Sequence, residues 1–318
     1  MIEVKNLTKK YGNFLAVSDL SFEIEKGHVY GFLGPNGAGK STTMNIITGC
    51  LSLTEGTVLV GGCDIFENPK EAKKLIGYLP EIPPLYVDQT PREYLEFVAE
   101  AKGIKRADIE SELEKVIAET HIEDVAGKLI KNLSKGYKQR VGIAQALLGN
   151  PEVIILDEPT VGLDPMQIIE IRDLIKELGE SHTVILSSHI LSEVEAICDR
   201  VLIINKGKLV AFDEPSKLRE TLANKNTIEV KIEASENEFD EICQKLSNIS
   251  SVEKEKIEEN LVEAVLTVDE ENPEAVCREL FFLLSKEGKP CIRLNPIKAS
   301  LEDIFIELTE GESNESSI

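Results

Sequence analysis

The sequence lacks the features that mark secreted, membrane-spanning and zinc-binding proteins. No window of the 318 residues holds the ~18 consecutive apolar residues of a membrane-spanning helix, so any membrane role needs spans from another chain. The N-terminus, Met1–Lys5, is typical of a strand and not of a signal peptide. The six cysteines include no C-x-x-C pair, which predicts a reduced, cytosolic protein with mostly small buried thiols and no zinc site.

Positive charge is also scarce. The net charge of −22 argues against a nucleic-acid-binding surface, because phosphate backbones need cationic contacts. The acidity is uneven, since residues 221–318 carry a net charge of −13 and the preceding 220 residues carry −9. A length sufficient for about two domains, together with this asymmetry, predicts two units of different character.

The sequence does contain a phosphate-binding loop, which fits G-x-x-x-x-G-K-[ST]. It lies between a predicted strand at 28–33 and a predicted helix at 40–48. Backbone N–H groups of the curled glycines and the helix N-terminus together favour an anion. We expect Lys40 to reach the β- and γ-phosphates and Ser41 to bind Mg²⁺, and we disfavour the alternative of a Gly-rich turn without a ligand. The nucleotide-binding residues predicted here are Gly34, Pro35, Asn36, Gly37, Ala38, Gly39, Lys40, Ser41 and Thr42.

Residues 1–220 have the pattern of an α/β domain. Residues 1–25 alternate between apolar and polar, which predicts half-buried, antiparallel N-terminal strands. Alternating strands and helices after the loop predict a mainly parallel sheet with ligand loops at its strand ends. Residues 87–150 change to a helical period and predict a helical subdomain, whose first helix begins with the capping box Thr90–Glu93.

A second, smaller domain is predicted at residues 227–308, after a helical connector at 215–226. Its order βαββαβ is that of a ferredoxin-like α+β domain. A short helix is expected at 300–305, and residues 309–318 form a polar, flexible tail. No motif in 227–308 carries chemistry, so a ligand-sensing regulatory module and a dimerisation surface both stay open as its role.

Side chains suited to hydrolysis follow two predicted buried strands. Asp157 and Glu158 come after the apolar run 153–156, where the first can hold Mg²⁺ and the second can orient or deprotonate a water. His189 follows the next buried strand at the same edge, where it can contact the γ-phosphate. Tyr11 precedes the phosphate loop in the fold, where its ring can stack on adenine. The structural alternatives are an acidic turn, a packed histidine and an ordinary turn tyrosine.

Together these motifs resemble the ATP-binding cassette (ABC) ATPases over about residues 1–220, with every family motif in order. The resemblance implies an ATPase in which two cassettes hold two ATP molecules, with Mg²⁺, between them. It implies that Ser134 and Gly136 bind the γ-phosphate of ATP held by the opposite subunit, and that Asp164 lies at the dimer seam. The matching positions are Tyr11, Gly34–Ser41, Leu133–Gly136, Val153–Glu158, Gly162–Asp164 and His189.

Two positions depart from the family pattern. Lys135-Gly136-Tyr137 replaces the usual two glycines and glutamine, but the serine and glycine that supply phosphate donors remain, so dimer closure should survive. Glu81 stands where glutamine is common; its carboxylate can still face Mg²⁺, while its charge makes a different contact. These departures and the segment 299–305 resemble exporter ATPase subunits whose permeases are separate chains. The resemblance implies a homodimer or heterodimer, held by the permease at the inner face of the cell membrane.

The apolar run Ile82–Tyr86 suits a short helix of such a permease, and a packed loop is the alternative. A second hypothesis is a soluble ABC-family ATPase that acts on ribosomes or DNA. Relatives of that kind carry two cassettes or a long coiled-coil insertion, and this acidic chain has neither. The transported substance cannot be read from this chain, because cargo specificity lies in the permease.

Overall fold

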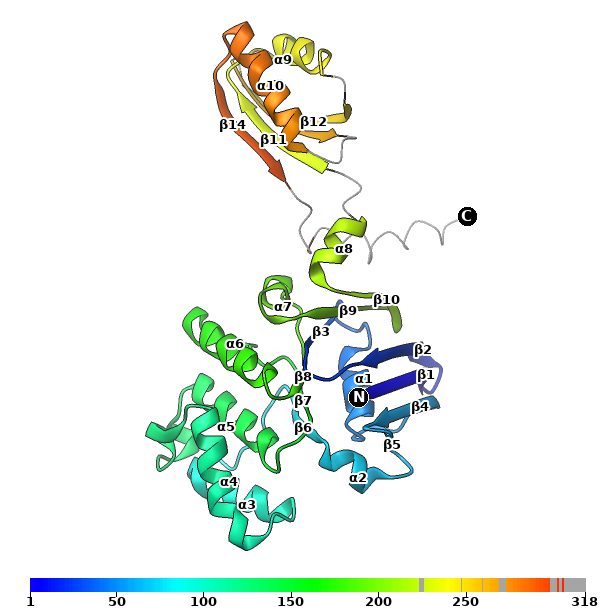
Figure 1. The fold of residues 1–318 in the computed structure, drawn as a ribbon, viewed down its shortest axis with the longest axis vertical. Helices are drawn as coiled ribbons and strands as arrows, with labels where there is room; N and C mark the ends of the chain where they lie inside the picture. Colours follow the sequence, from blue (N-terminus) through cyan, green and yellow to red (C-terminus); the bar gives the residue numbers. More distant parts are fainter. Residues whose placement is uncertain are drawn as a thin grey trace. The chain divides into compact units, whose positions relative to one another are not determined.

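The computed structural model divides into two compact units, Met1–Pro215 and Ser216–Ile318 (Figure 1). Each unit has its own hydrophobic core. Two of the segments predicted above lie outside the described residues: the tail at 309–318, and the helix at 300–305 except for residues 302 and 305. The structure describes residues 1–222, 226–246, 248–258, 260–268, 273–297, 302 and 305.

The first unit begins with an antiparallel sheet of strand order β2-β1-β4-β5. The strands β1 and β2 form a hairpin that pairs Tyr11 with Phe14 at its end. The predicted antiparallel N-terminal strands are thus confirmed, since the alternating apolar side chains of both strands enter the core. The strands are β1 (Ile2–Tyr11), β2 (Phe14–Ile24), β4 (Glu55–Val60) and β5 (Cys63–Asp64).

A second sheet has the order β10-β9-β3-β8-β7-β6, in which all neighbours are parallel except the edge strand β10. The strand β8 separates β3 from β7. Because parallel strands end at the same edge, the loops after β3, β8 and β7 lie side by side. The strands are β3 (Val29–Leu33), β6 (Ile76–Leu79), β7 (Val153–Leu156), β8 (Thr183–Ser187), β9 (Arg200–Asn205) and β10 (Lys208–Asp213).

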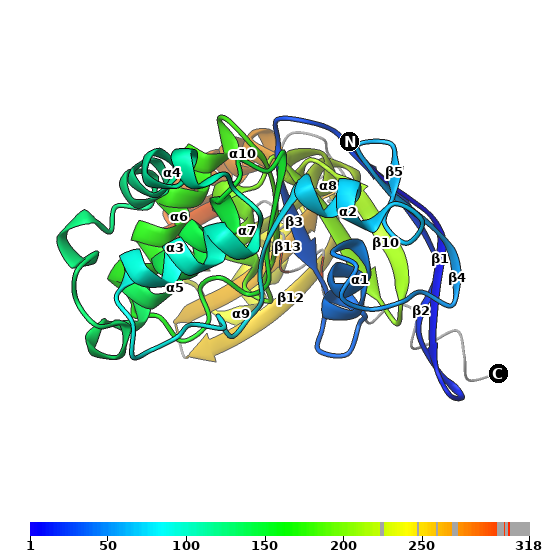
Figure 2. The same cartoon turned by 90° about the horizontal axis from the view of Figure 1, so that it is seen from below.

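Helices cover both faces of the parallel sheet (Figures 1 and 2). The helix α1 (Lys40–Ile47) lies between the two sheets and contributes Met44, Ile46 and Ile47 to their shared core. The helices α5 (Lys135–Leu147), α6 (Pro165–Gly179) and α7 (Leu191–Ile197) pack on the other face, against β6, β8 and β3 respectively. A further helix, α2 (Pro69–Lys74), was not predicted, because it is short and lacks an apolar face.

The helical subdomain is built from α3 (Pro91–Ala101), α4 (Arg106–Glu119), two 3₁₀ turns (Glu123–Val125 and Ile130–Asn132) and α5. The predicted capping box is present at the start of α3. The hydroxyl of Thr90 accepts from the Glu93 N–H, and the Glu93 carboxylate accepts from the Thr90 N–H at 2.8 Å. These bonds satisfy donors that a helix start otherwise leaves unpaired.

The second unit contains a sheet of order β12-β13-β11-β14, antiparallel throughout, which is the ferredoxin-like order. One face of this sheet carries a core with Phe239 and Leu280 at its centre. None of the helices in the described part of either unit is long and apolar enough to cross a membrane. The elements are α8 (Pro215–Leu222), β11 (Asn226–Ile232), α9 (Glu236–Cys243), β12 (Ile249–Glu258), β13 (Leu261–Val268), α10 (Pro273–Glu287) and β14 (Cys291–Ile297).

Candidate functional site

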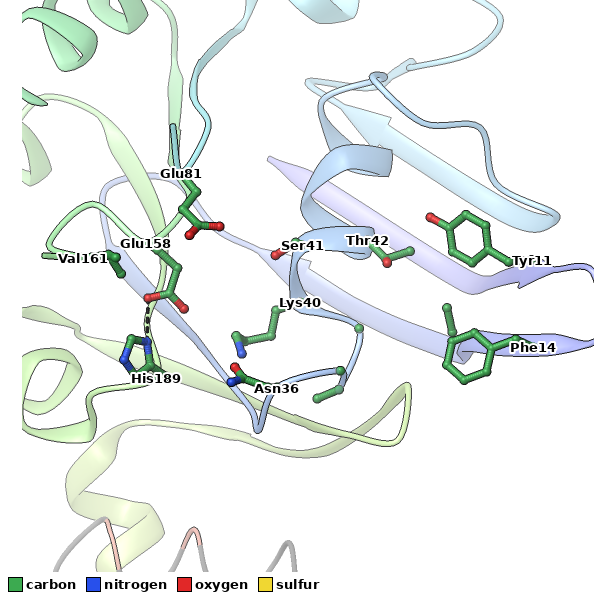
Figure 3. Close-up of a pocket in the computed structure, with 14 residues that line it drawn as sticks. Tyr11, Phe14, Asn36, Lys40, Ser41, Thr42, Glu81, Glu158, Val161 and His189 are labelled. Carbon is green, nitrogen blue, oxygen red and sulfur yellow. Dashed lines mark hydrogen bonds and ion pairs between the residues drawn. The ribbon is translucent and has the colours of Figure 1, made fainter. Parts of the chain in front are cut away.

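A pocket of about 440 Å³ opens at the edge of the first unit where the parallel strands end. Figure 3 shows aromatic rings at one end and the Glu158 and His189 side chains at the other, with Lys40 and Ser41 between them. The lining residues are Tyr11, Phe14, Ala16, Asn36, Gly37, Ala38, Gly39, Lys40, Ser41, Thr42, Glu81, Glu158, Val161 and His189. Most of the predicted site residues therefore share one cavity.

The phosphate loop folds tightly around the lysine side chain. Gly39 caps α1 with φ of 106°, and a side chain there would meet the Ala16 carbonyl oxygen at 2.8 Å. Lys40 is 7% exposed, and its ammonium donates to the carbonyl oxygens of Gly34 at 2.6 Å and Pro35 at 3.4 Å. Gly34 and Pro35 thus hold the Lys40 ammonium through their carbonyl oxygens, although neither residue lines the cavity.

The buried position of Lys40 affects its protonation. Burial lowers its pKa, while the negative charges of Glu158 and Asp157 act in the opposite direction. A phosphate placed at the loop would add negative charge beside the ammonium and favour its charged form. The loop therefore supplies an oriented cation and helix N–H groups for an anion.

The two carboxylates after β7 are fixed by the neighbouring strand β8. The Ser187 hydroxyl donates to Asp157 Oδ1 at 2.6 Å and accepts from the Glu158 N–H at 2.8 Å. Asp157 is only 5% exposed, and its N–H donates to the Leu79 carbonyl at 2.9 Å. Glu158 has a φ of 50°, in the left-handed region that non-glycine residues rarely adopt, so this turn is held by its surroundings.

Glu158 and His189 are paired. His189 Nδ1 lies 2.9 Å from Glu158 Oε2 (Figure 3). The Glu158 side chain is 13% exposed and the His189 side chain 53%, so the carboxylate is sheltered while the ring faces solvent. A sheltered carboxylate held by one oxygen leaves the other free to orient or deprotonate a water.

The oxygen donors of the pocket fit a magnesium ion. The Ser41 hydroxyl and the exposed Glu81 carboxylate line the pocket, and the buried Asp157, which does not line it, directly precedes Glu158. All three offer hard oxygen ligands of the kind that Mg²⁺ prefers. The residues that the structure describes hold no group of three or more His, Cys, Asp or Glu arranged as a metal cage. Mg²⁺ needs no such cage, because it keeps several waters and takes oxygens from the nucleotide phosphates.

Six predicted site residues do not line this cavity. Gly34, Pro35 and Asp157 lie one or two positions along the chain from residues that do, whereas Ser134, Gly136 and Asp164 lie farther from them. The Ser134 hydroxyl caps α5 by accepting from the Tyr137 N–H at 3.3 Å, and Asp164 caps α6 by accepting from the Gln167 N–H at 2.9 Å. Gly136 is packed against Gln167, whose Cδ would lie 3.0 Å from an added side-chain carbon. The start of α5 thus packs on the start of α6, and neither reaches the nucleotide loop of its own chain.

Lys135 and Tyr137, which depart from the family pattern at the start of α5, have partners within the same chain. Lys135 Nζ lies against Gly162, which has φ of 69°, so an added side chain there would collide with it. The Tyr137 hydroxyl donates to Asp124 Oδ2 at 3.0 Å, and this bond and the nearby negative charge raise the pKa of the phenol. The lysine and the tyrosine therefore make contacts within their own subunit.

Phe14, Ala16, Val161 and Ser187 were not predicted as site residues. Phe14 lies beside Tyr11 because the two residues pair across the β1–β2 hairpin. The only signal in the sequence for this pairing is the short turn between the two strands. Ser187 precedes Ser188 and His189 at the end of β8. Its partners Asp157 and Glu158 follow β7, and their proximity depends on strand order, which the sequence does not state.

An apolar surface lies near the pocket, on the loop that follows Glu81 and on α3. What we call the Tyr86 surface consists of Tyr86, Val87 and Phe97, which are 50%, 45% and 45% exposed, together with Ile82, which precedes Tyr86 on the same loop and is 81% exposed. The Tyr86 ring lies 5.3 Å from the Phe97 ring and 5.7 Å from the buried Tyr94 ring, between centroids. Exposed apolar groups gathered in this way are typical of an interaction site.

Comparisons with known proteins relate this chain to one family. The sequence profile of the ABC transporter family matches residues 17–161. The bacitracin transport ATP-binding protein BcrA of Bacillus licheniformis is 42% identical over 222 residues, covering 68% of this chain and 72% of BcrA. The linearmycin resistance ATP-binding protein LnrL of Bacillus subtilis (strain 168) is 31% identical over 310 residues, 97% of this chain and 98% of LnrL.

A solved structure is similar to about two thirds of this chain. It is the dimeric, post-hydrolysis state of the ATP-binding cassette MJ0796 bound to ADP and Pi. The TM-score is 0.60 at 28% identity, and the match covers 67% of this chain and 98% of that chain. The same fold has therefore been seen with nucleotide and as a dimer in that protein.

Proposed function

The chain belongs to the ABC transporter family as an ATP-binding subunit, and from this premise we propose that it hydrolyses ATP to power a membrane exporter. The observation that carries the proposal is the paired Glu158 and His189 in the same pocket as Lys40. Export is supported by relatives named for bacitracin transport and linearmycin resistance. The alternative of a soluble ATPase acting on ribosomes or DNA has no such observation in its favour.

The proposed mechanism divides the pocket into three parts. The rings of Tyr11 and Phe14 stack on the base, and Lys40 with the loop N–H groups binds the phosphates. Glu158 accepts a proton from the attacking water, while His189 orients Glu158 and reaches the γ-phosphate. Ser41 and Asp157, with Glu81 nearby, would hold Mg²⁺, which when bound neutralises charge on the β- and γ-phosphates.

A dimer is proposed because Ser134, Gly136 and Asp164 lie outside the pocket of their own chain. Ser134 begins a helix of 13 residues, and such an N-terminus attracts an anion. We infer that Ser134 and Gly136 bind the γ-phosphate held by a second subunit, identical or different, with Asp164 at the seam. ATP binding then favours the closed dimer and hydrolysis releases it, which is a shift in population.

The partner at the membrane is proposed to be a separate permease chain. The Tyr86 surface offers an apolar site, and Glu81 on the same loop lines the nucleotide pocket. A short permease helix on this surface would therefore lie close to a residue that contacts the nucleotide site. This arrangement would hold the subunit at the inner face of the cell membrane.

The variant Glu158→Gln tests the function. It keeps the shape of the side chain but removes the base, so we expect ATP to bind while turnover falls at least about 100-fold. The variant should accumulate as a dimer in MgATP, measured by size-exclusion chromatography with light scattering. The control is Glu180→Gln, at the exposed C-cap of α6. Near-normal turnover of Glu158→Gln would remove Glu158 from the catalytic role.

A further inference from the structure

A buried carboxylate lies behind the proposed catalytic pair. Glu193 on α7 is 2% exposed and does not line the pocket. Its Oε2 accepts from the Thr160 hydroxyl at 2.6 Å and from the Ser188 hydroxyl at 3.3 Å. Thr160 and Ser188 are themselves 3% and 1% exposed. Since an unpaired buried carboxylate is costly, these bonds define one arrangement of the three side chains.

The Glu193 carboxylate also lies close to an arginine of the helix α6. Arg172 on α6 places Nη2 3.6 Å from Glu193 Oε1, and the arginine side chain is 24% exposed. The Nε of Arg172 is buried and has no hydrogen-bond partner within the described residues. Glu193 is therefore the charged group that ties α6 and α7 together at this point.

The two hydroxyl partners of Glu193 belong to the two loops that carry the catalytic pair. Thr160 follows Glu158 by two residues, and Ser188 directly precedes His189. The Ser188 hydroxyl also accepts from the Ile190 N–H at 3.0 Å, which fixes the turn that presents His189. Ser187 joins the same loops from the other side through Asp157 and Glu158. The two loops are thus joined twice, once through the Ser187 hydroxyl and once through the Glu193 carboxylate.

We propose that Glu193 is a positioning residue, which through Thr160 and Ser188 sets the geometry of Glu158 relative to His189. This rests on the proposed function, because it assigns Glu193 to the same hydrolysis. The Thr160 loop continues to Asp164, with the Leu163 N–H donating to the Thr160 carbonyl at 3.2 Å. Glu193 therefore also connects the pair to the segment proposed to lie at the dimer seam.

The test uses small changes to the hydrogen bonds. Thr160→Val keeps the shape but removes the hydroxyl, and Glu193→Gln keeps an acceptor but removes the charge. We expect each to lower kcat about ten- to 100-fold, since a small misplacement of catalytic groups has effects of that size. The Kd for a fluorescent ATP analogue should change by less than about twofold. Thr160→Ser, which restores the hydroxyl, should recover most of kcat, and Ser192→Ala on the exposed side of α7 is the control.

The background of Glu158→Gln separates positioning from mere loss of structure. If Glu193 acts through Glu158, adding Thr160→Val or Glu193→Gln to Glu158→Gln should lower the residual rate no further. A full additional loss in that background, or wild-type kcat in Thr160→Val, would overturn the proposal. If Glu193→Gln fails to fold, Thr160→Val and Thr160→Ser decide alone. A failure of the proposed function would be recognised by a different result, because Glu158→Gln alone would then hydrolyse ATP at the normal rate.

Discussion

At the scale of single residues, the site depends on a cation that the fold has already withdrawn from water. Lys40 is surrounded by the carbonyls of its own loop, and burial opposes its charge. The desolvation of this side chain is a cost borne by the folded protein before any ligand binds. Phosphate oxygens then meet an ammonium whose position is already set, which lowers the ordering cost of binding.

The variant Lys40→Ala tests that role. Removing the ammonium takes away the charge that faces the β- and γ-phosphates, so the ATP affinity should fall at least about 100-fold, or about 2.7 kcal/mol. The affinity is measured as the Kd of a fluorescent ATP analogue in the presence of MgCl₂. Lys70→Ala, on the exposed surface of α2, serves as the matched control and should bind as the wild type does. Equal affinity in Lys40→Ala would contradict the phosphate-loop assignment.

Residues of a motif and residues at the ends of neighbouring strands could be predicted, whereas individual hydrogen bonds between separate segments could not. The loop Gly34–Ser41 is contiguous, so its spacing alone implies one concave turn. The bond between Thr160 and Glu193 joins residues 33 positions apart, one in the loop after β7 and the other in α7. It arises because β7 and β8 are neighbours in the sheet, and neither residue belongs to a pattern that a single sequence displays.

At the scale of elements, helix starts were the most readable boundaries. The starts of α3, α5 and α6 carry Thr90, Ser134 and Asp164, each with a side chain that accepts from the helix backbone. Such a cap needs a particular residue type at one position, so the sequence records it. The helix α2 and the two 3₁₀ turns were missed, because elements of one or two turns contain too few residues to show a period.

A capping box in the second unit predicts an acid-sensitive helix. The Glu238 carboxylate accepts from Lys289 Nζ at 2.6 Å and from the Ser235 N–H and hydroxyl, each at 2.9 Å. The lysine bond first, and then the Ser235 bonds, lower the pKa of Glu238 to about 2. A lowered folded-state pKa adds stability above the unfolded value, near 4.5, and that stability is lost as pH falls toward about 2.

The measurement is the free energy of unfolding of the second unit between about pH 5 and pH 3. The wild type should lose stability as the pH is lowered, and Glu238→Gln, which cannot ionise, should show a shallower dependence. Lys289→Met removes the partner and should flatten the curve in the same direction. Parallel curves for all three proteins would show that this pairing makes no contribution in solution.

The loop after β6 allows a test of the proposed permease contact. Ile82 is 81% exposed at the edge of the Tyr86 surface, so Ile82→Asp should place a charge in the proposed interface without disturbing a core. We expect co-purification with the permease to fall at least about tenfold, while the ATPase rate of the isolated subunit stays within about twofold. Phe282→Asp, at a 69% exposed position on α10, is the control. Equal co-purification of both variants would exclude this docking surface.

At the scale of the whole molecule, the chain is organised around two hydrophobic cores. The predicted boundary at residues 220–227 rested on the change of strand pattern and of charge, and the structural units part at Pro215. The observed boundary lies nearer the N-terminus than the predicted one because α8, predicted as a connector, groups with the second unit.

The two cores predict two unfolding transitions, of which nucleotide shifts only one. All six tyrosines lie within residues 1–137 and tryptophan is absent, so tyrosine fluorescence follows the first unit. A ligand that binds the folded state at 100 times its Kd adds about 2.7 kcal/mol. For a domain of this size that energy raises Tm by about 5–10 °C. Calorimetry of Glu158→Gln with MgATP should show this shift in the transition that fluorescence reports, and none in the other.

The double variant with Lys40→Ala is the control for that experiment, because it should unfold at one temperature with or without ATP. A shift of equal size in both transitions would mean that nucleotide binding stabilises the second unit as directly as the first. Residues 227–308 would then be part of the nucleotide response, which favours the regulatory role over a separate dimerisation surface. A shift confined to the fluorescence transition assigns the ATP linkage to the core that contains Lys40, since only a unit that contacts the ligand gains binding energy.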